Sequence, residues 1–306
     1  MRVLQRRPAN PIDRWEDGRY RRTIRIDDQP VLVEVFNAGS TETPNVRLRV
    51  LANKLSVTQR SKVERIVSEV LGADADPTGP QARASAEPAL RETALALRGM
   101  RPPRYPELLE TFVNVIPFQQ VSLESGMATV ARIVRRFGGG LTVDGQRYCL
   151  FPTVEAIASA RVTSLRACGL SAHKSRALLA VAREIASDNL TAGELAGLST
   201  TAAMERLMRL SGIGPWSAAL VLLRGFRRMD VFPQADTGAE SGLTKLLRLR
   251  SKAALTPVID RFGDYRGYLY FYGLASRLLQ AGLIHPATTQ AQPPGRVAVM
   301  RDERGG

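Results

Sequence analysis

The side chain best placed to do chemistry is Asp236, within residues 230–238 (DVFPQADTG). Leucines at 243, 246 and 247 follow with helical spacing, so a helix is predicted to begin here, with Asp236 as its N-cap or with Thr237 and Glu240 as a capping box. A carboxylate at a helix N-terminus is kept ionised by the helix dipole and by backbone N–H donors. Capping is therefore compatible with a second role, in which Asp236 faces a group that becomes positively charged during a reaction.

A second segment with chemical potential is residues 210–218 (LSGIGPWSA), which lies between two stretches of helical periodicity. Two helices joined in this way predict a helix-hairpin-helix near residues 203–225. Gly212 and Gly214 allow a tight turn and close approach of the backbone to another surface, and Pro215 suits the first turn of the second helix. The N–H groups of this turn would bind one phosphate, whereas the alternative is an ordinary turn between two helices.

The elements that must position these segments divide into two kinds. Residues 20–27, 30–39 and 46–53 predict strands, with alternating apolar residues clearest in the third, and residues 57–71 predict a helix. A stretch at 73–88 rich in Pro, Ala, Gly and Asp indicates a boundary, and residues from 86 to about 283 have the spacing of an all-α domain. We therefore expect an α+β protein with domains at 1–80 and 81–286 and a disordered tail at 287–306.

Composition limits the class of protein. The chain has 306 residues, and 43 Lys and Arg against 29 Asp and Glu give a net charge of +14, which favours a polyanionic partner, although an arginine-rich surface alone would look the same. Only Cys149 and Cys168 are present, too few for a four-cysteine zinc site or iron-sulfur cluster. Since no apolar run reaches membrane-spanning length and no signal peptide is visible, we expect a soluble cytoplasmic protein with no membrane association.

The motifs resemble one known family. The hairpin at 210–218 and the segment from 224 (RGF) through 230–232 (DVF) to Asp236 carry the resemblance, with support from residues 118–122 (FQQVS), 151–153 (FPT) and 265–268 (YRGY). Together these blocks resemble the helix-hairpin-helix DNA glycosylases, in particular the 3-methyladenine DNA glycosylase II branch. The resemblance implies a curved antiparallel N-terminal sheet beside a helical glycosylase domain. It also implies a base excision repair enzyme that flips alkylated purines out of duplex DNA and hydrolyses their glycosidic bond.

The resemblance also assigns roles to residues that bind the DNA. Gly212, Ile213 and Gly214 match the phosphate-binding hairpin, and we group Ser217 with them as a DNA-binding residue. Gln120 falls where relatives insert a side chain into the gap left by the flipped nucleotide, while its alternative role is a polar helix start. The backbone carbonyls of Leu210 and Ile213 would hold a sodium or potassium ion, and no other cofactor is expected.

The remaining assignments concern the reaction. Asp236 matches the catalytic aspartate, and Trp216 the aromatic that stacks on the flipped base, where an indole face would attract a cationic alkylpurine. We place Tyr272 in the same base pocket. Bifunctional relatives carry a lysine at the position of Trp216, so the expected enzyme is monofunctional.

Two departures from the family pattern leave alternatives open. Glu240 stands where relatives carry Lys or Arg, and Leu220 and Leu274 stand where they carry pocket aromatics. These departures would suit a noncatalytic DNA-damage-binding protein or a glycosylase for a different damaged base. Asp236 favours the enzyme, because a protein that only binds DNA gains nothing from a carboxylate facing phosphates. We expect a monomer whose partner is duplex DNA containing damaged bases.

Overall fold

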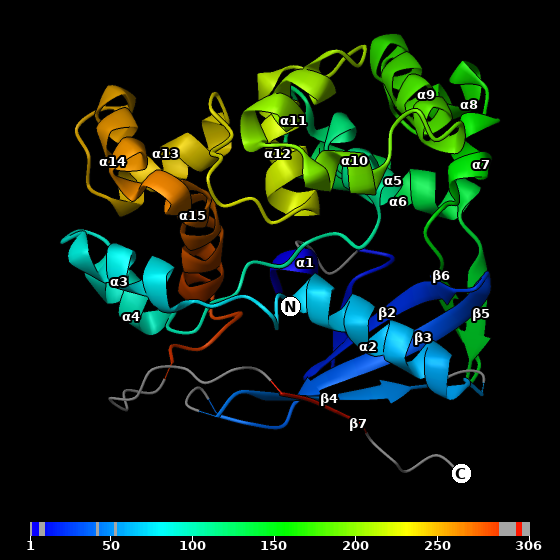
Figure 1. Cartoon of the computed structure of the whole chain (residues 1–306), viewed down its shortest axis with the longest axis horizontal. Coiled ribbons are helices and arrows are strands. Elements are labelled where there is room, and N and C mark those ends of the chain that lie inside the picture. Colours follow the sequence, from blue (N-terminus) through cyan, green and yellow to red (C-terminus); the bar gives the residue numbers. More distant parts are fainter. Residues whose placement is uncertain (1, 6–9, 41–42, 52–53, 288–297, 302–306) are drawn as a thin grey trace.

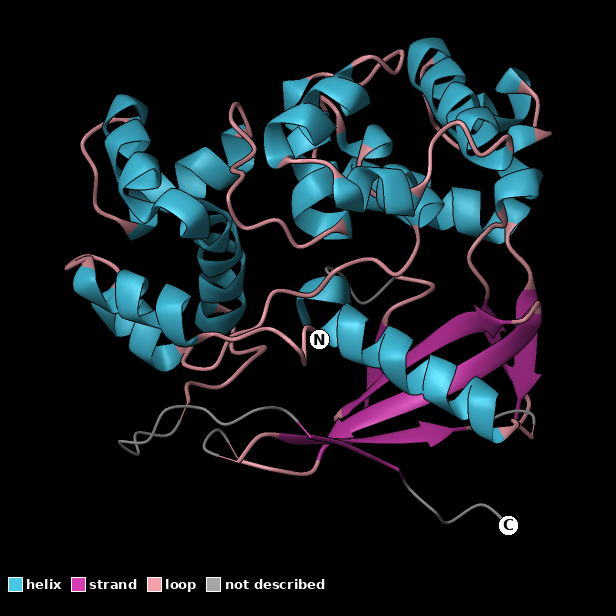
Figure 2. Ribbon diagram, viewed as in Figure 1, coloured by secondary structure: helices cyan, strands magenta, loops and turns pink. Residues whose placement is uncertain are grey.

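The N-terminal part of the chain is a small antiparallel sheet covered by one helix. The computed structural model describes residues 2–5, 10–40, 43–51, 54–287 and 298–301. Helix α1 spans Arg2–Gln5, and strands β1 to β4, each antiparallel to the next, span Arg14–Glu16, Arg19–Ile26, Gln29–Asn37 and Asn45–Val50. Helix α2, Val57–Leu71, lies across one face of the sheet, as Figures 1 and 2 show.

Helix α2 is fixed by local sequence signals at both ends. Ser56 and Gln59 form a capping box at its start, and Gly72 ends it in the left-handed conformation with φ +70°. Its apolar stripe at Val63 and Val67 packs on the buried side chains of β2 and β3. The three predicted strands and the helix at 57–71 are confirmed.

The second part of the chain is mostly helical. Its helices are α3 Thr78–Ala86, α4 Arg91–Ala96, α5 Leu108–Val113, η1 Ile116–Phe118, α6 Leu123–Phe137, α7 Val154–Ala158, α8 Val162–Ala167, α9 Ala172–Ala186, α10 Ala192–Gly197, α11 Thr200–Met208, α12 Pro215–Gly225, α13 Thr237–Leu246, η2 Lys252–Ala254, α14 Leu255–Phe262, η3 Gly263–Tyr265 and α15 Arg266–Gln280. Helix α12 is buried from Ser217 to Arg224 and so forms the centre of the larger core. The mixed α+β architecture is confirmed (Figure 2), and strands β1 to β4 precede helices α3 to α15 along the chain (Figure 1).

The sequence had predicted that the second part would be all helical, but this part also contains two strands. Strands β5, Gly140–Val143, and β6, Gln146–Cys149, form an antiparallel hairpin beside the N-terminal sheet. Its turn residues Asp144 and Gly145 both have positive φ, +49° and +75°. An Asp-Gly pair between two short extended segments is the usual signal for such a turn.

Two further segments differ from the sequence expectation. Helix α3 occupies most of the predicted boundary at 73–88 and packs on α4. A helix can form here because the Gly and Pro residues of α3 fall in its first turn, where a helix tolerates them. In the tail predicted to be disordered, Ala298–Arg301 form β7, whose backbone pairs in parallel with β4. Residues 288–297 and 302–306 of that tail lie outside the described residues.

A buried ionic cluster joins the two parts. Arg22 of β2 donates to Asp13 Oδ1 at 2.6 Å and to Glu110 of α5, and all three side chains are at most 5% exposed. Burial raises the pKa of Glu110 to about 7, while the Arg22 guanidinium acts in the opposite direction. The sheet and helical parts are therefore tied through their cores.

Candidate active site and nucleic-acid interface

The predicted helix-hairpin-helix is formed by α11, α12 and the turn between them. Gly212 has φ +80°, and a Cβ built on it would lie 2.6 Å from the Ala177 Cβ of α9. Gly214 caps α12 in extended conformation, and a Cβ there would meet no atom within 4 Å. Glycine is thus required at 212 both by the positive φ and by the close packing against α9. Gly214 instead faces open space from which a ligand could approach.

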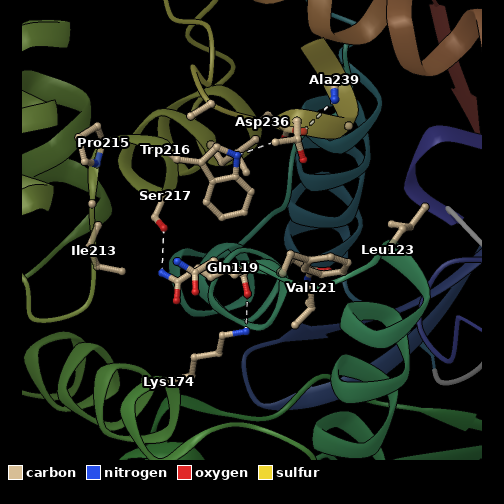
Figure 3. Close-up of a pocket in the computed structure, with 18 of the residues that line it drawn as sticks. Gln119, Val121, Leu123, Lys174, Ile213, Pro215, Trp216, Ser217, Asp236 and Ala239 are labelled. Carbon is tan, nitrogen blue, oxygen red and sulfur yellow. Dashed lines mark hydrogen bonds between the residues drawn. The ribbon is translucent and has the colours of Figure 1, made fainter. Parts of the chain in front are cut away.

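One glutamine ties this hairpin to a neighbouring loop. The Gln119 Nε2 donates to the Gly212 carbonyl at 2.8 Å and to Ser217 Oγ at 2.9 Å. The Lys174 ammonium, on α9, donates to the carbonyls of Gln119 and Pro117 at 2.5 and 3.3 Å, and burial lowers its pKa. Figure 3 shows Gln119 between the hairpin and Lys174. No function had been predicted for Gln119 or Lys174.

The loop anchored in this way presents Gln120. This residue is exposed and has φ +53°, and Val121 and Leu123 after it are 42% and 38% exposed. Because the Gln119 side chain is bound to the hairpin, the loop is held while Gln120 extends from it. Gln120 therefore lies exposed at the lining of the cleft described below.

Asp236 is the N-cap of α13, and its carboxylate receives two hydrogen bonds. Oδ1 accepts the Ala239 N–H at 2.8 Å, and Oδ2 accepts the Trp216 indole N–H at 3.2 Å. Both Asp236 and Trp216 are half-buried, and Figure 3 shows the indole pointing toward the carboxylate. The helix start and the hairpin are therefore joined at the group most suited to stabilise a cation.

The capping geometry differs in one detail from the predicted capping box. The cap is Asp236, not Thr237, and Glu240 is one residue too far along to bond the cap itself. Its Oε1 instead accepts the N–H of Ala235 at 2.8 Å. Glu240 is thus part of the turn that carries Asp236.

A cleft of about 1510 Å³ lies along these elements. Its lining includes the loop at 119–123, the hairpin at 210–217, the start of α13 and one face of α15. Trp216, Leu220, Tyr270 and Leu274 give part of the cleft an apolar and aromatic wall next to Asp236. Such a wall can hold a flat base by stacking, with the carboxylate at its edge.

Two sequence assignments need revision. Tyr272 does not line the cleft: it is 1% exposed, and its hydroxyl lies 3.5 Å from Gln81 Oε1 of α3. Residues two apart on a helix point to opposite sides, so Tyr270 lines the cleft instead. Ser217 is 2% exposed and its hydroxyl accepts from Gln119, so this side chain is part of the hairpin's internal structure and does not present its hydroxyl to DNA.

The described residues hold no group of three or more His, Cys, Asp or Glu side chains arranged for a metal ion. In the same residues, no helix is both long and apolar enough to cross a membrane. The thiols of Cys149 and Cys168 are free, and burial raises the pKa of Cys168.

Comparison with known proteins agrees with this geometry. Residues 113–257 match the model of the HhH-GPD superfamily base excision DNA repair protein, and residues 1–107 match the AlkA N-terminal domain. The DNA-3-methyladenine glycosylase of Bacillus subtilis (strain 168) is 26% identical over 242 residues, which cover 74% of this chain and 80% of that protein. The chain therefore belongs to the HhH-GPD superfamily of base excision DNA repair proteins, and it is a DNA glycosylase.

Two solved structures are also similar. The 3-methyladenine DNA glycosylase from Archaeoglobus fulgidus superposes with a TM-score of 0.75 at 28% identity, covering 90% of this chain and 92% of that one. The 3-methyladenine DNA glycosylase of Schizosaccharomyces pombe, in complex with abasic DNA, has a TM-score of 0.54 at 25% identity, covering 65% of this chain and 96% of that one. The expected family and its N-terminal sheet domain are confirmed.

Proposed function

We propose that this glycosylase is monofunctional and removes alkylated purines of the 3-methyladenine and 7-methylguanine type from duplex DNA by hydrolysis. The observation that carries the proposal is the Asp236 carboxylate, held by two N–H donors at the edge of an aromatic cleft beside the hairpin. As the glycosidic bond breaks, the sugar becomes an oxocarbenium-like cation, and a fixed anion stabilises that state more than the ground state. The names of the relatives support the substrate class.

The other residues that line the cleft would bind the DNA and the flipped base. The hairpin backbone at Gly212, Ile213 and Gly214 would bind one DNA phosphate, and Gln120 would fill the gap left by the flipped nucleotide. Trp216 and Tyr270 would stack on the base, and a base made cationic by alkylation would gain from the Trp216 ring. Water would then attack the sugar carbon.

We further propose that the hairpin backbone holds an alkali cation. The Leu210 carbonyl accepts the Ile213 N–H at 3.1 Å, which leaves one of its two lone pairs for a ligand. The Leu210 and Ile213 carbonyls would hold a sodium or potassium ion there, and its charge would attract the same phosphate. The chemical step itself requires no cofactor in this proposal.

The nucleophile of a strand-cleaving reaction is missing from the expected position, which Trp216 occupies. Among the described lysines, Lys174 alone lines the cleft, and its ammonium is bound to the carbonyls of Pro117 and Gln119. An ammonium that donates to carbonyl oxygens does not present a lone pair to the sugar. This supports hydrolysis without formation of a Schiff base.

The test is base release under single-turnover conditions from duplexes carrying 3-methyladenine, 7-methylguanine, hypoxanthine or ethenoadenine. Asp236→Asn should slow release by at least about 100-fold and leave DNA binding intact or tighter, because it removes the transition-state charge and a repulsion from phosphates. Asp260→Asn, the same charge change at an exposed site outside the cleft, is the control. A wild-type rate in Asp236→Asn would leave Asp236 as a helix cap only, and release confined to the neutral lesions would exclude the alkylpurine substrate.

A further inference from the structure

The residue before the proposed catalytic aspartate has a strained backbone. Ala235 has φ +62°, in the left-handed region that residues with a Cβ rarely adopt. Ala235 is exposed, so packing does not impose this conformation. Such strain persists only where neighbouring groups hold it, and it is concentrated at functional sites.

Two hydrogen bonds hold this turn, one from the Asp236 N–H to the Pro233 carbonyl at 3.3 Å and one to the Glu240 carboxylate. The Glu240 Oε1, one turn of α13 beyond the cap, accepts the N–H of Ala235 itself at 2.8 Å. The first turn of α13 is held by a separate contact, because Arg277 Nη2 of α15 donates to the Gly238 carbonyl at 2.7 Å. Gly242 leaves room for this guanidinium, because a Cβ there would lie 2.3 Å from Arg277 Nη2. Loss of Glu240 would therefore leave Ala235 held only by the Pro233–Asp236 turn bond, while α13 remains anchored.

We propose that Glu240 is a positioning residue that acts on Asp236 through the backbone of Ala235. The inference rests on the proposed role of Asp236. With Ala235 held in the left-handed conformation, the chain enters α13 with the Asp236 carboxylate directed toward Trp216 and the cleft. At this position a basic residue would add a phosphate contact, whereas Glu240 supplies an acceptor for the turn and places a negative charge near the DNA.

These two effects of Glu240 can be separated, because the hydrogen bond needs only an oxygen while the repulsion needs a charge. Glu240→Gln keeps an acceptor and removes the charge, and Glu240→Ala removes both. Both variants should bind damaged duplex as tightly as the wild type or more tightly. The single-turnover rate at saturating enzyme should remain within about threefold of wild type in Glu240→Gln and fall about tenfold in Glu240→Ala.

A second pair of variants separates positioning from general damage to the fold. Glycine adopts φ +62° without strain, so Glu240→Ala should cost less in the Ala235→Gly background than in the wild type. Glu240→Lys should bind DNA most tightly and yet lose rate like Glu240→Ala, since an ammonium cannot accept the Ala235 N–H. Thermal unfolding of each variant should stay close to wild type, because Arg277 and the Asp236 cap still hold α13.

The outcomes are distinguishable from failure of the proposed function. If Asp236→Asn abolishes release and Glu240→Ala keeps the wild-type rate, the positioning role is wrong and the role of Asp236 stands. Equal rate losses in Glu240→Gln and Glu240→Ala would also overturn it, because the charge and not the acceptor would then matter. If Asp236→Asn itself keeps the wild-type rate, both proposals fail.

Discussion

The two hairpin glycines differ in whether a side chain can be accommodated, and an alanine substitution at each should show this difference in stability. At Gly212 the backbone has φ +80°, and a Cβ would lie 2.6 Å from Ala177 Cβ and 3.3 Å from His173 Nε2. At Gly214 φ is −96° and a Cβ would meet nothing within 4 Å. Gly212→Ala should therefore damage the folded state, while Gly214→Ala should not.

The magnitude at Gly212 has two sources. Placing a residue with a Cβ in the left-handed region costs about 1 to 2 kcal/mol. Forcing a methyl group against α9 adds the roughly 1 to 3 kcal/mol typical of overpacking, because the nearest atom belongs to a buried alanine that cannot move aside. The free energy of unfolding should fall by about 2 to 5 kcal/mol. For Gly214→Ala, at an ordinary φ, the change should lie between zero and a gain of about 1 kcal/mol.

Urea unfolding of the wild type and both variants measures these changes, and binding to damaged duplex provides the second assay. Gly214→Ala should weaken DNA binding despite its intact stability, because its methyl group would occupy the open side where a phosphate is proposed to approach. Equal stability losses in the two variants would refute the assignment of Gly212 to packing. Unchanged DNA affinity in Gly214→Ala would refute the approach of DNA to this side of the hairpin.

Three further predictions concern the chemistry in the cleft. Trp216→Ala should slow release of cationic alkylpurines up to roughly 30-fold more than release of neutral hypoxanthine, since a desolvated cation–aromatic attraction is worth up to about 2 kcal/mol; equal losses on both lesions would leave Trp216 a packing role. Gln120→Ala should weaken binding to abasic-site duplex by about 1 to 3 kcal/mol, measured by titration, and unchanged affinity would place the inserted side chain elsewhere. Incubation with damaged duplex and borohydride should trap no covalent adduct, and an adduct that disappears in Lys174→Gln would show that a lyase reaction occurs.

The parts of the fold that could be predicted from the sequence are those whose signals are local. Alternation at 46–50 and the helical apolar spacing within 57–71 are both local patterns, and both elements appear where they were predicted. The hairpin at 140–149 also had a local signal in Asp144-Gly145, which the prediction of an all-α domain overlooked. Helix α3 was hidden by composition, since proline and glycine count against a helix except in its first turn.

Some members of the site were predictable from the sequence, but the contacts between them were not. Asp236 and Trp216 were both singled out, but the hydrogen bond between them joins two separate elements and has no signal in either. Two adjacent glutamines at 119 and 120 gave no indication that one would bind the hairpin while the other extends outward. Helical spacing could have corrected Tyr272, because Tyr270 and Leu274 are four residues apart and share a face.

The ionic cluster at Arg22 has a consequence for the chain as a composite of modules. The two family models meet between residues 107 and 113, and Glu110 falls inside that junction. Its cation comes from a strand 88 positions earlier. A chimera that replaced the N-terminal module with one lacking an arginine at this register would bury Glu110 unpaired, at a cost of about 3 to 5 kcal/mol. The junction between the two modules is thus also the place where the sequence of each module constrains the sequence of the other.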